Sequence, residues 1–496
     1  MRSLLGLIGC LAALSAGAQT DTVPGVSTPI VSTRHAITVA GKTLRYTARA
    51  GVLPIRHNDD GSVRAYIFFV AYIADRSPGE RPRPITFAWN GGPGANSLLL
   101  HLSAFGPRRL DVGDGVGGAR RPARVVDNGE TLLTQTDLVF VDPVGTGFSR
   151  PTAPAYASDF YGVREDIAVT REFIRVYRTR FDAWDAPVYL AGESYGTWRA
   201  SGVAAAMADA GERVAGVILI SGGIPVGPIV SPEMRAGLFL PSRIATAAYH
   251  HRLADDVQRD TARAMGEAAE WGMTVYAPAL AKRDTLSAQT RASIGARLTR
   301  YTGVDARVID PKTLVVDRRT FVQNMVLGRS VGTFDTRQVA GADSSAADRA
   351  EAAQSRLLLA RYLREELGFK TDLTYQGLEV SASSRELDPN SAWKWDQGEP
   401  GATMIPVDDG PPGGASPWVQ RTFAADPSTR TFVAAGIYDS LNSCPLIAYQ
   451  VSRLEPALRD RITTGCYAGG HMMYEDRATR VKLRQDLARF LDRGSR

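Results

Sequence analysis

The sequence has 496 residues and a formal net charge of +6, with 44% hydrophobic and 22% charged residues, which is ordinary globular composition and enough chain for a large core. Its arginines are scattered and form no basic run interleaved with aromatic residues, which argues against a nucleic-acid-binding protein. No spacing of His, Cys, Asp or Glu indicates a metal site, and we expect neither a metal nor a cofactor.

The N-terminus has the pattern of a secretory leader. Arg2 is followed by a short apolar stretch and by Ala-Gly-Ala at residues 16–18, which predicts a signal peptide over residues 1–18. The apolar stretch is too short to cross a bilayer, which takes about 20 residues, and no later segment has the apolar length of a membrane span. We therefore expect an exported protein, periplasmic or extracellular, with lipid attachment at Cys10 as a minor alternative.

The first folded segments read as an antiparallel arrangement. Alternating apolar residues predict strands over 36–39, 44–49 and 63–73, with Asp60-Gly61 as a hairpin turn. Strands and helices then alternate. Continuous apolar runs at 84–89 and 138–141 are typical of buried parallel strands, and Asp159 is expected to cap a helix that reaches Phe181.

A glycine-rich loop follows the strand at 84–89. Residues 90–94 read Asn-Gly-Gly-Pro-Gly, so backbone N–H groups are exposed in this loop and could stabilise a developing oxyanion. A phosphate cradle is the alternative. The loop lacks the lysine and hydroxyl residue of the phosphate-binding motif, so we set that reading aside.

Gly-Glu-Ser-Tyr-Gly at residues 192–196 stands between an apolar run, Val188 to Ala191, and a helical segment over 197–208. A G-x-S-x-G between strand and helix is the nucleophile elbow, in which the serine is lifted from the sheet edge and the glycines avoid collision with neighbouring elements. The alternative is a chance Gly/Ser turn. Ser194 is the predicted nucleophile.

A serine nucleophile needs a base, and in this topology acid and histidine follow the serine in that order. Of the six histidines, His471 follows two glycines and a strand predicted to end at Cys466. Asp439 comes after a strand over 430–436 and could orient His471, or could be an ordinary turn residue. Cys444 and Cys466 form a disulfide or remain two buried thiols; both readings stay open.

Five blocks occur in the order found in the serine carboxypeptidases, and the chain resembles a secreted, bacterial-type member of that family. The blocks are residues 90–94, 142–149, 192–196, 436–439 and 469–472. The resemblance implies an α/β-hydrolase fold: a mixed, mostly parallel sheet flanked by helices, with an inserted, mostly helical cap. Residues 19–229 and 386–496 would form the core and residues 230–385 the cap, or else an unrelated appended domain.

The resemblance also implies roles for single residues. Ser194, Asp439 and His471 match the catalytic triad, and Gly92 and Tyr195 match the oxyanion donors. Groups that hold the C-terminal carboxylate of the substrate correspond to Asn90, Gly91 and Glu193. Glu193 would have to be protonated, because two charged carboxylates in contact repel each other.

One position departs from the family pattern. A second glutamate usually stands two residues before the Gly-Pro that closes the glycine-rich block, and here that position is Ala104. His101 could compensate, although a lone histidine in a Leu-rich segment is more often a core residue.

The sequence thus predicts a serine-type carboxypeptidase that acts on peptides with a free C-terminus. An esterase or acyltransferase would keep the same triad, and a catalytically silent carboxylate-binding protein is the alternative from another class.

Overall fold

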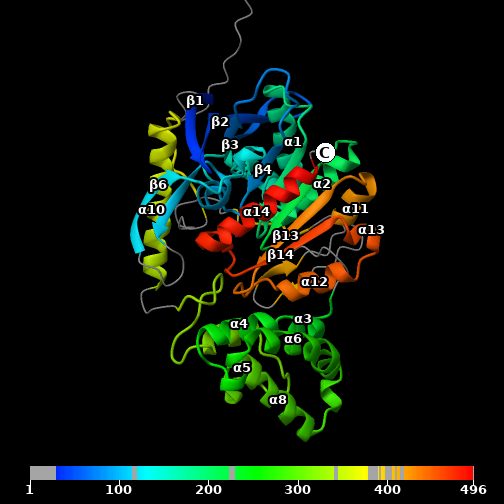
Figure 1. Ribbon diagram of the computed structural model, residues 1–496. Coiled ribbons are helices and arrows are strands. Elements are labelled where there is room, and N and C mark those ends of the chain that lie inside the picture. Colours follow the sequence, from blue (N-terminus) through cyan, green and yellow to red (C-terminus); the bar gives the residue numbers. More distant parts are fainter. Residues whose placement is uncertain are drawn as a thin grey trace, which may run out of the picture.

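A ten-stranded mixed sheet forms the centre of the computed structural model (Figure 1). The structure describes residues 30–113, 120–222, 230–339, 344–377, 389, 392–396, 405–407, 410–413 and 418–494. The predicted signal peptide and Cys10 lie outside these residues.

The strand order of the central sheet is β1-β2-β3-β7-β4-β9-β10-β13-β14, with β8 paired to β3. These strands are β1 (Ile30–Val39), β2 (Lys42–Arg56), β3 (Val63–Ala74), β4 (Ile85–Trp89), β7 (Asp137–Val141), β8 (Arg150–Pro151), β9 (Val188–Glu193), β10 (Gly216–Ile220), β13 (Arg430–Gly436) and β14 (Ile462–Tyr467). Outside this sheet, β5 (Arg108–Gly113) pairs with β6 (Arg120–Asp127), and β11 (Ile405–Val407) pairs with β12 (Gly410–Gly413).

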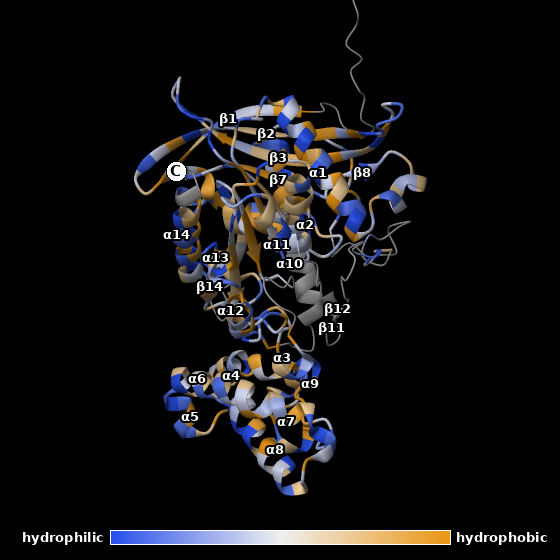
Figure 2. Ribbon diagram, turned by 90° about the vertical axis from the view of Figure 1, so that its right-hand side faces the viewer, coloured by the Kyte–Doolittle hydropathy of each residue, from blue (hydrophilic) through white to orange (hydrophobic). Residues whose placement is uncertain are grey.

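The two halves of the sheet have the predicted directions. Strands β1, β2, β3 and β7 pair antiparallel, whereas β7, β4, β9, β10, β13 and β14 pair parallel. The central parallel strands β4, β7, β9 and β10 are buried on both faces, as their continuous apolar runs indicate, and Figure 2 colours the central strands mainly as hydrophobic.

Helices cover both faces of the sheet. Because side chains alternate along a strand, Leu138 and Phe140 of β7 belong to one hydrophobic cluster and Val139 and Val141 to the other. The cluster with Leu138 also receives side chains from η1 (Leu100–Phe105), α10 (Ser344–Glu365) and α14 (Arg477–Gly494). The opposite cluster receives them from α1 (Val163–Arg180), α2 (Gly196–Asp209), α11 (Trp418–Ala425) and α12 (Cys444–Ser452).

A group of helices between β10 and β13 has a hydrophobic cluster of its own and lies below the sheet in Figure 1. It comprises α3 (Pro232–Leu238), α4 (Leu240–Tyr249), α5 (Asp255–Arg259), α6 (Thr261–Trp271), η4 (Gly272–Tyr276), α7 (Ala277–Ala281), α8 (Ala288–Thr302) and α9 (Arg318–Asn324). Leu238 and Phe239 pack against Leu446 of α12, and the Ser443 hydroxyl donates to the Leu238 carbonyl at 2.7 Å. Leu359 and Tyr362 of α10 instead pack with the sheet.

One sequence expectation about helices needs correction. Helix α1 begins at Val163 with Gly162 as its N-cap, so Asp159 does not cap it; residues Pro154–Asp159 form a short 3-10 helix, and Asp159 pairs with Arg64 at 2.8 Å. Between β13 and β14 the chain forms α12 and the separate helix α13 (Pro456–Arg459), because Pro456 cannot continue the hydrogen bonding of the preceding turn.

A buried ion pair connects helix α2 to its neighbours. The Arg199 guanidinium of α2 donates from Nε to Asp166 of α1 at 2.8 Å and from Nη1 to the Asn90 carbonyl at 3.0 Å. The side chains of Arg199 and Asp166 are 1% and 2% exposed. Removal of one partner from such a pair leaves a buried charge without compensation, which is strongly destabilising.

We therefore expect Asp166→Ala to lower the free energy of unfolding by about 3–5 kcal/mol. Chemical denaturation with far-UV circular dichroism measures this change. The control is Glu365→Ala, which removes a carboxylate from the exposed Arg361–Glu365 pair and should leave the transition midpoint in place. Equal midpoints for Asp166→Ala and the unaltered protein would contradict the role given to the buried pair.

Candidate active site

The predicted triad residues are held around the end of strand β10. The backbone N–H of Ser194 donates to the Ile220 carbonyl at 2.9 Å, and the hydroxyl of the next residue, Ser221, donates to the His471 carbonyl at 2.6 Å. Strands β9, β10, β13 and β14 are parallel neighbours, so the loops that follow them meet at one sheet edge. The structure thereby brings the loops of Ser194, Asp439 and His471 together.

Ser194 occupies the strained turn expected of a nucleophile elbow. Its φ angle is 56°, a left-handed conformation that is rare for residues other than glycine. Strand β9 ends at Glu193 and helix α2 begins at Gly196, which matches the predicted strand and helix. A Cβ atom at Gly192 would overlap the carbonyl of Gly196, and one at Gly196 would lie 2.9 Å from the Trp89 ring. Both glycines are therefore required by close packing.

Asp439 and His471 form a buried hydrogen-bonded pair. The Nδ1 atom of His471 lies 2.8 Å from Oδ2 of Asp439, and the two residues are 3% and 1% exposed. Asn442 donates to the same carboxylate oxygen at 2.8 Å and to the Ser221 carbonyl at 3.0 Å. Burial favours the neutral imidazole, but the adjacent Asp439 carboxylate outweighs this effect and raises the pKa of His471.

The other ring nitrogen of His471 is available for proton transfer. Its Nε2 atom is buried and makes no hydrogen bond to any residue that the structure describes. Hydrogen bonds between base and nucleophile are often long without substrate and tighten when substrate binds. An imidazole oriented through Nδ1 by a carboxylate can accept a proton at Nε2 from a nearby alcohol.

The glycine-rich loop after β4 lies directly against the elbow. A Cβ atom at Gly91 would lie 2.5 Å from the Tyr195 nitrogen and 2.7 Å from the Glu193 carbonyl oxygen. Gly92, the next residue, has a φ angle of 113°. The loop backbone and the Tyr195 amide are therefore adjacent, which is the arrangement that two oxyanion donors need.

Glu193 is a buried carboxyl group at the centre of the site. It accepts a hydrogen bond from Nδ2 of Asn90 at 3.0 Å and a second from the Tyr474 hydroxyl. Burial raises the pKa of Glu193, although these hydrogen bonds and the charge of His471 act in the opposite direction. The Asn90 amide is oriented by the backbone N–H of Leu100, which donates to its Oδ1 at 3.0 Å.

His101 does not take the place of the glutamate missing at Ala104. Its Nε2 lies 2.6 Å from the Tyr72 hydroxyl, and its ring stacks on Phe140. Burial lowers the pKa of His101 to about 3, so the ring is neutral at ordinary pH. It is a core residue, as the Leu-rich surroundings indicate.

A segment after α9 crosses the catalytic loops. The His471 N–H donates to the Phe334 carbonyl at 2.6 Å, and Thr336 donates its N–H to the Tyr438 carbonyl at 2.9 Å. The Phe334 ring lies 5.3 Å from the His471 ring and is half exposed. Sequence reasoning missed Phe334, because nothing in a stretch without a motif marks a residue that returns to the site.

The two remaining site predictions concern cysteines and metals. Cys444 and Cys466 are joined in a disulfide with their Cα atoms 5.7 Å apart, which links the start of α12 to the end of β14. Within the described ranges, no three His, Cys, Asp or Glu residues cluster in a way that could hold a metal ion.

The sequence is similar to fungal carboxypeptidases over part of its length. It is 34% identical to a carboxypeptidase Y homologue of Arthroderma benhamiae over 146 residues, which are 28% of this chain and 26% of that protein. With the pheromone-processing carboxypeptidase KEX1 of Saccharomyces cerevisiae it shares 31% identity over 157 residues, 29% of this chain and 20% of that protein. The matched region spans about a quarter of the length of these curated relatives.

The fold is similar to that of a solved carboxypeptidase. The crystal structure of Kex1(Δ)p, a prohormone-processing carboxypeptidase from Saccharomyces cerevisiae, superimposes with a TM-score of 0.55 and 14% identity, covering 90% of this chain and 91% of that one. This likeness supports the predicted α/β-hydrolase fold. The family model described as serine carboxypeptidase matches residues 41–289, half of the sequence. The chain belongs to the serine carboxypeptidase family.

Proposed function

We propose that this protein is a serine-type carboxypeptidase that removes C-terminal residues from peptides through an acyl-enzyme on Ser194. The observation that carries the proposal is the buried Asp439–His471 hydrogen bond, with Ser194 and His471 both bonded to the end of β10. Membership of the family supports the same assignment.

In the proposed reaction, His471 Nε2 takes the proton of the Ser194 hydroxyl as the oxygen attacks the carbonyl carbon of the last peptide bond. Asp439 keeps the imidazole oriented and stabilises the imidazolium. The oxyanion accepts hydrogen bonds from the amides of Gly92 and Tyr195. His471 then gives its proton to the leaving amine, and water releases the acyl group by the same steps in reverse order.

Restriction to a terminal residue requires recognition of its carboxylate. We assign this role to Asn90, Gly91 and Glu193, which are joined by the Asn90–Glu193 hydrogen bond and by the contact of Gly91 with the Glu193 backbone. Protonated Glu193 can donate to a substrate carboxylate, whereas the ionised form repels it. The raised pKa of Glu193 supports this assignment.

The helical group between β10 and β13 is proposed as a cap within residues 230–385 that shapes the substrate pocket and excludes water. The exposed Phe334 ring beside His471 supports a contact between this region and the substrate.

We further propose that the protein is exported to the periplasm or the extracellular space after removal of residues 1–18. The Cys444–Cys466 disulfide supports an oxidising compartment. None of the helices in the described ranges is long and apolar enough to span a bilayer.

Incubation of the purified protein with a peptide mixture, followed by mass spectrometry, tests the proposed specificity. We expect products shortened from the C-terminus by one residue at a time. Internal cleavage, or acyl transfer to an alcohol without terminal trimming, would contradict the proposed carboxypeptidase function and indicate a different type of serine hydrolase.

Ser194→Ala should abolish covalent labelling by a fluorophosphonate, because the attacking oxygen is lost. Intact-mass spectrometry gives the extent of labelling. Ser201→Ala is the matched control: Ser201 is a buried serine of α2 whose hydroxyl has no hydrogen-bond partner among the described residues, and this variant should label fully. Undiminished labelling of Ser194→Ala would remove Ser194 from the mechanism.

Gly91→Ala should lower kcat by about 10²–10³-fold, the cost of losing one oxyanion donor, because the new methyl group collides with the Tyr195 amide. Steady-state kinetics on a chromogenic ester measures kcat, and circular dichroism checks the fold. At Gly129 a methyl group meets nothing within 4 Å, so Gly129→Ala is the control. A kcat equal to that of the control would place the oxyanion donors elsewhere.

Glu193→Gln should flatten the loss of peptidase activity between mildly acidic and neutral pH, since an amide can donate to the substrate carboxylate without being protonated first. The test is kcat/KM as a function of pH on a peptide with a free C-terminus. Glu172→Gln changes a helix glutamate that pairs with Arg175 and should keep the original profile. An unchanged profile in Glu193→Gln would contradict carboxylate recognition by Glu193.

A further inference from the structure

Tyr474 is the second side chain that holds Glu193. It lies on a 3-10 helix (η8, Met473–Glu475) that follows His471, and the side chain is fully buried. Its hydroxyl donates to Oε2 of Glu193, while Asn90 donates to Oε1. The carboxyl group at the centre of the site is therefore held between an amide and a phenol.

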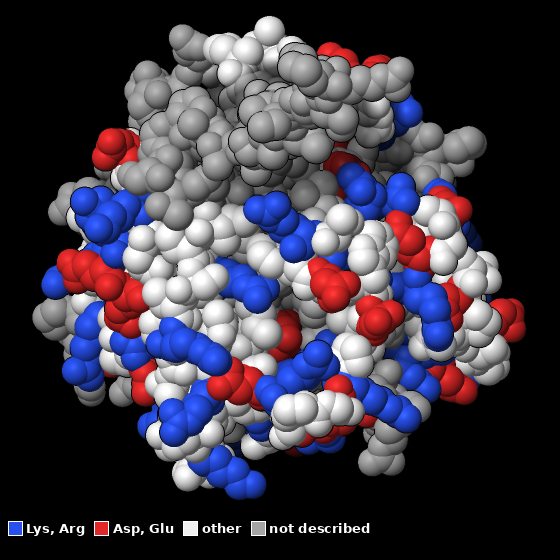
Figure 3. Space-filling model, turned by 90° about the horizontal axis from the view of Figure 1, so that it is seen from above, with Lys and Arg blue, Asp and Glu red and all other residues white. Residues whose placement is uncertain are grey.

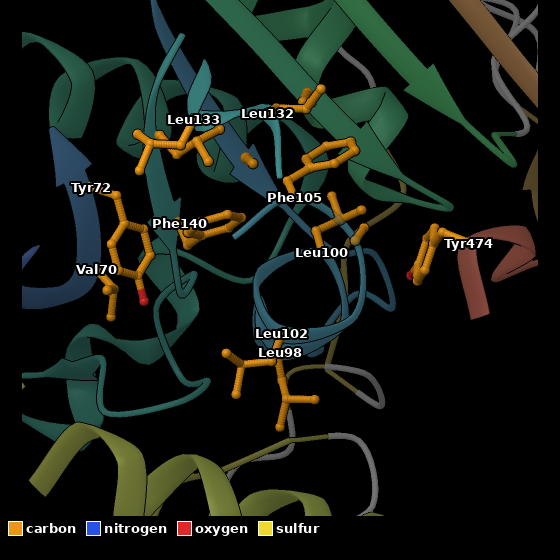
Figure 4. Close-up of a cluster of buried hydrophobic side chains, with 14 of the residues drawn as sticks. Val70, Tyr72, Leu98, Leu100, Leu102, Phe105, Leu132, Leu133, Phe140 and Tyr474 are labelled. Atoms are coloured by element: carbon orange, nitrogen blue, oxygen red, sulfur yellow. The ribbon is translucent and has the colours of Figure 1, made fainter. Parts of the chain in front are cut away.

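Ala104 lies in the neighbourhood of this phenol in the folded chain. Ala104, Phe105 and Tyr474 line the same small cavity, and Tyr474 belongs to the hydrophobic cluster that includes Leu100 and Phe105. Figure 4 shows the Tyr474 ring beside Leu100, approaching from the C-terminal part of the chain. The family pattern has a second carboxyl group at the position of Ala104. This protein has a methyl group there, and the aromatic hydroxyl of Tyr474 lies in the same region.

A hydroxyl and a carboxyl partner affect Glu193 in opposite ways. Two adjacent carboxyl groups share one proton, because both cannot be ionised at short distance. A hydroxyl that donates to an ionised carboxylate stabilises the charged form instead. Burial and the nearby charge of Glu193 raise the pKa of Tyr474 well above its usual value, so the phenol remains a donor throughout the working range.

The other charged groups around this pair are identified. His471 and Asp439 act on Glu193 by charge, with opposite signs, and Glu475 acts on Tyr474. Arg480 donates to the Tyr474 carbonyl at 2.8 Å and lies 3.7 Å from Glu130. Unlike these charged groups, Tyr474 is neutral, so its hydrogen bond to Glu193 can be removed without a change of charge.

We propose that Tyr474 is a positioning residue for substrate recognition: its hydroxyl holds Glu193 and sets the upper pH at which Glu193 can donate to the C-terminal carboxylate of a peptide. This inference rests on the proposed carboxypeptidase function and adds to it the residue that tunes its pH range.

The test is Tyr474→Phe, which keeps the ring and removes the donor. The loss of a hydrogen bond to a charged group changes the pKa of that group by about one to two pH units. The pH above which kcat/KM falls on a peptide with a free C-terminus should therefore rise by about that amount. An ester substrate without a free carboxylate should show no shift. An unmoved limit, a downward shift, or equal changes on both substrates would overturn the proposal.

Two further variants separate this role from a structural one. Tyr189→Phe also removes a buried hydroxyl from the same hydrophobic cluster, one that lies 3.4 Å from the Leu491 carbonyl, and should leave the pH profile unchanged. In a Glu193→Gln background, Tyr474→Phe should no longer shift the upper limit. A shift that persists in the double variant would show that Tyr474 acts through another group.

Infrared difference spectroscopy provides a readout that does not depend on peptidase activity. The carboxyl band that disappears in Glu193→Gln should titrate at higher pH in Tyr474→Phe than in the unaltered protein. If peptides are not trimmed but this band shifts, the proposed function fails while the Tyr474–Glu193 coupling stands. If peptides are trimmed and the band does not shift, the coupling fails alone.

Discussion

The whole site depends on the way the chain ends strand β10. The carbonyl of Ile220 accepts the Ser194 N–H, and the adjacent Ser221 hydroxyl binds the backbone of His471. Ser221 itself has a φ angle of 48°, so its backbone departs from the strand direction at this point. Asn442 closes the arrangement by bonding both the Ser221 carbonyl and Asp439. The Ser221–His471 hydrogen bond, which joins residues 250 positions apart, thereby aligns the histidine loop with the loop of Ser194 at one strand end.

Three ionisable side chains, Asp166, Glu193 and Arg199, are buried around helix α2. Asp166 and Arg199 form an ion pair, and Arg199 also supports the backbone of the glycine-rich loop through the Asn90 carbonyl. Glu193 has no cation bonded to it among the described residues and is held by neutral donors. Burial raises the pKa of both carboxyl groups. The charge of Arg199 opposes this effect at Asp166, whereas hydrogen bonds from neutral donors and the more distant charge of His471 oppose it at Glu193.

Surface charge plays a smaller part. On the face seen in Figure 3, basic and acidic side chains of the described residues are interspersed, and no broad area of one sign is formed there. The groups proposed to recognise a carboxylate are not on this surface: Asn90 and Glu193 are buried near Ser194, where short distances and exclusion of water strengthen each interaction.

Local patterns were sufficient to predict the elements that carry the chemistry. Gly192 and Gly196 mark the elbow because close packing excludes any side chain there, and the apolar runs of β7 and β9 indicate parallel strands. Tyr474 could not be assigned in the same way. An aromatic residue three positions after a histidine is ordinary core sequence, and its meaning depends on Ala104, which comes near it only in the folded chain.

The same limit explains the error at the start of α1. Asp159 has the residue type of a helix cap, but Arg64, 95 residues earlier, pairs with it. This tertiary partner outweighs a local preference that is worth only about 1 kcal/mol. Composition also does not show which surface a helix packs against: Leu359 and Tyr362 of α10 pack with the sheet.

The segment from Thr333 to Thr336 has a consequence for engineering. Its backbone is hydrogen-bonded to Ser440, Tyr438 and His471, so it links the inserted helices directly to the proposed general base. Exchange of the insertion for that of another hydrolase would cut this link unless these four residues were kept with the core. The pocket can thus be varied by recombination without displacing His471 only when the chains are joined outside residues 333–336.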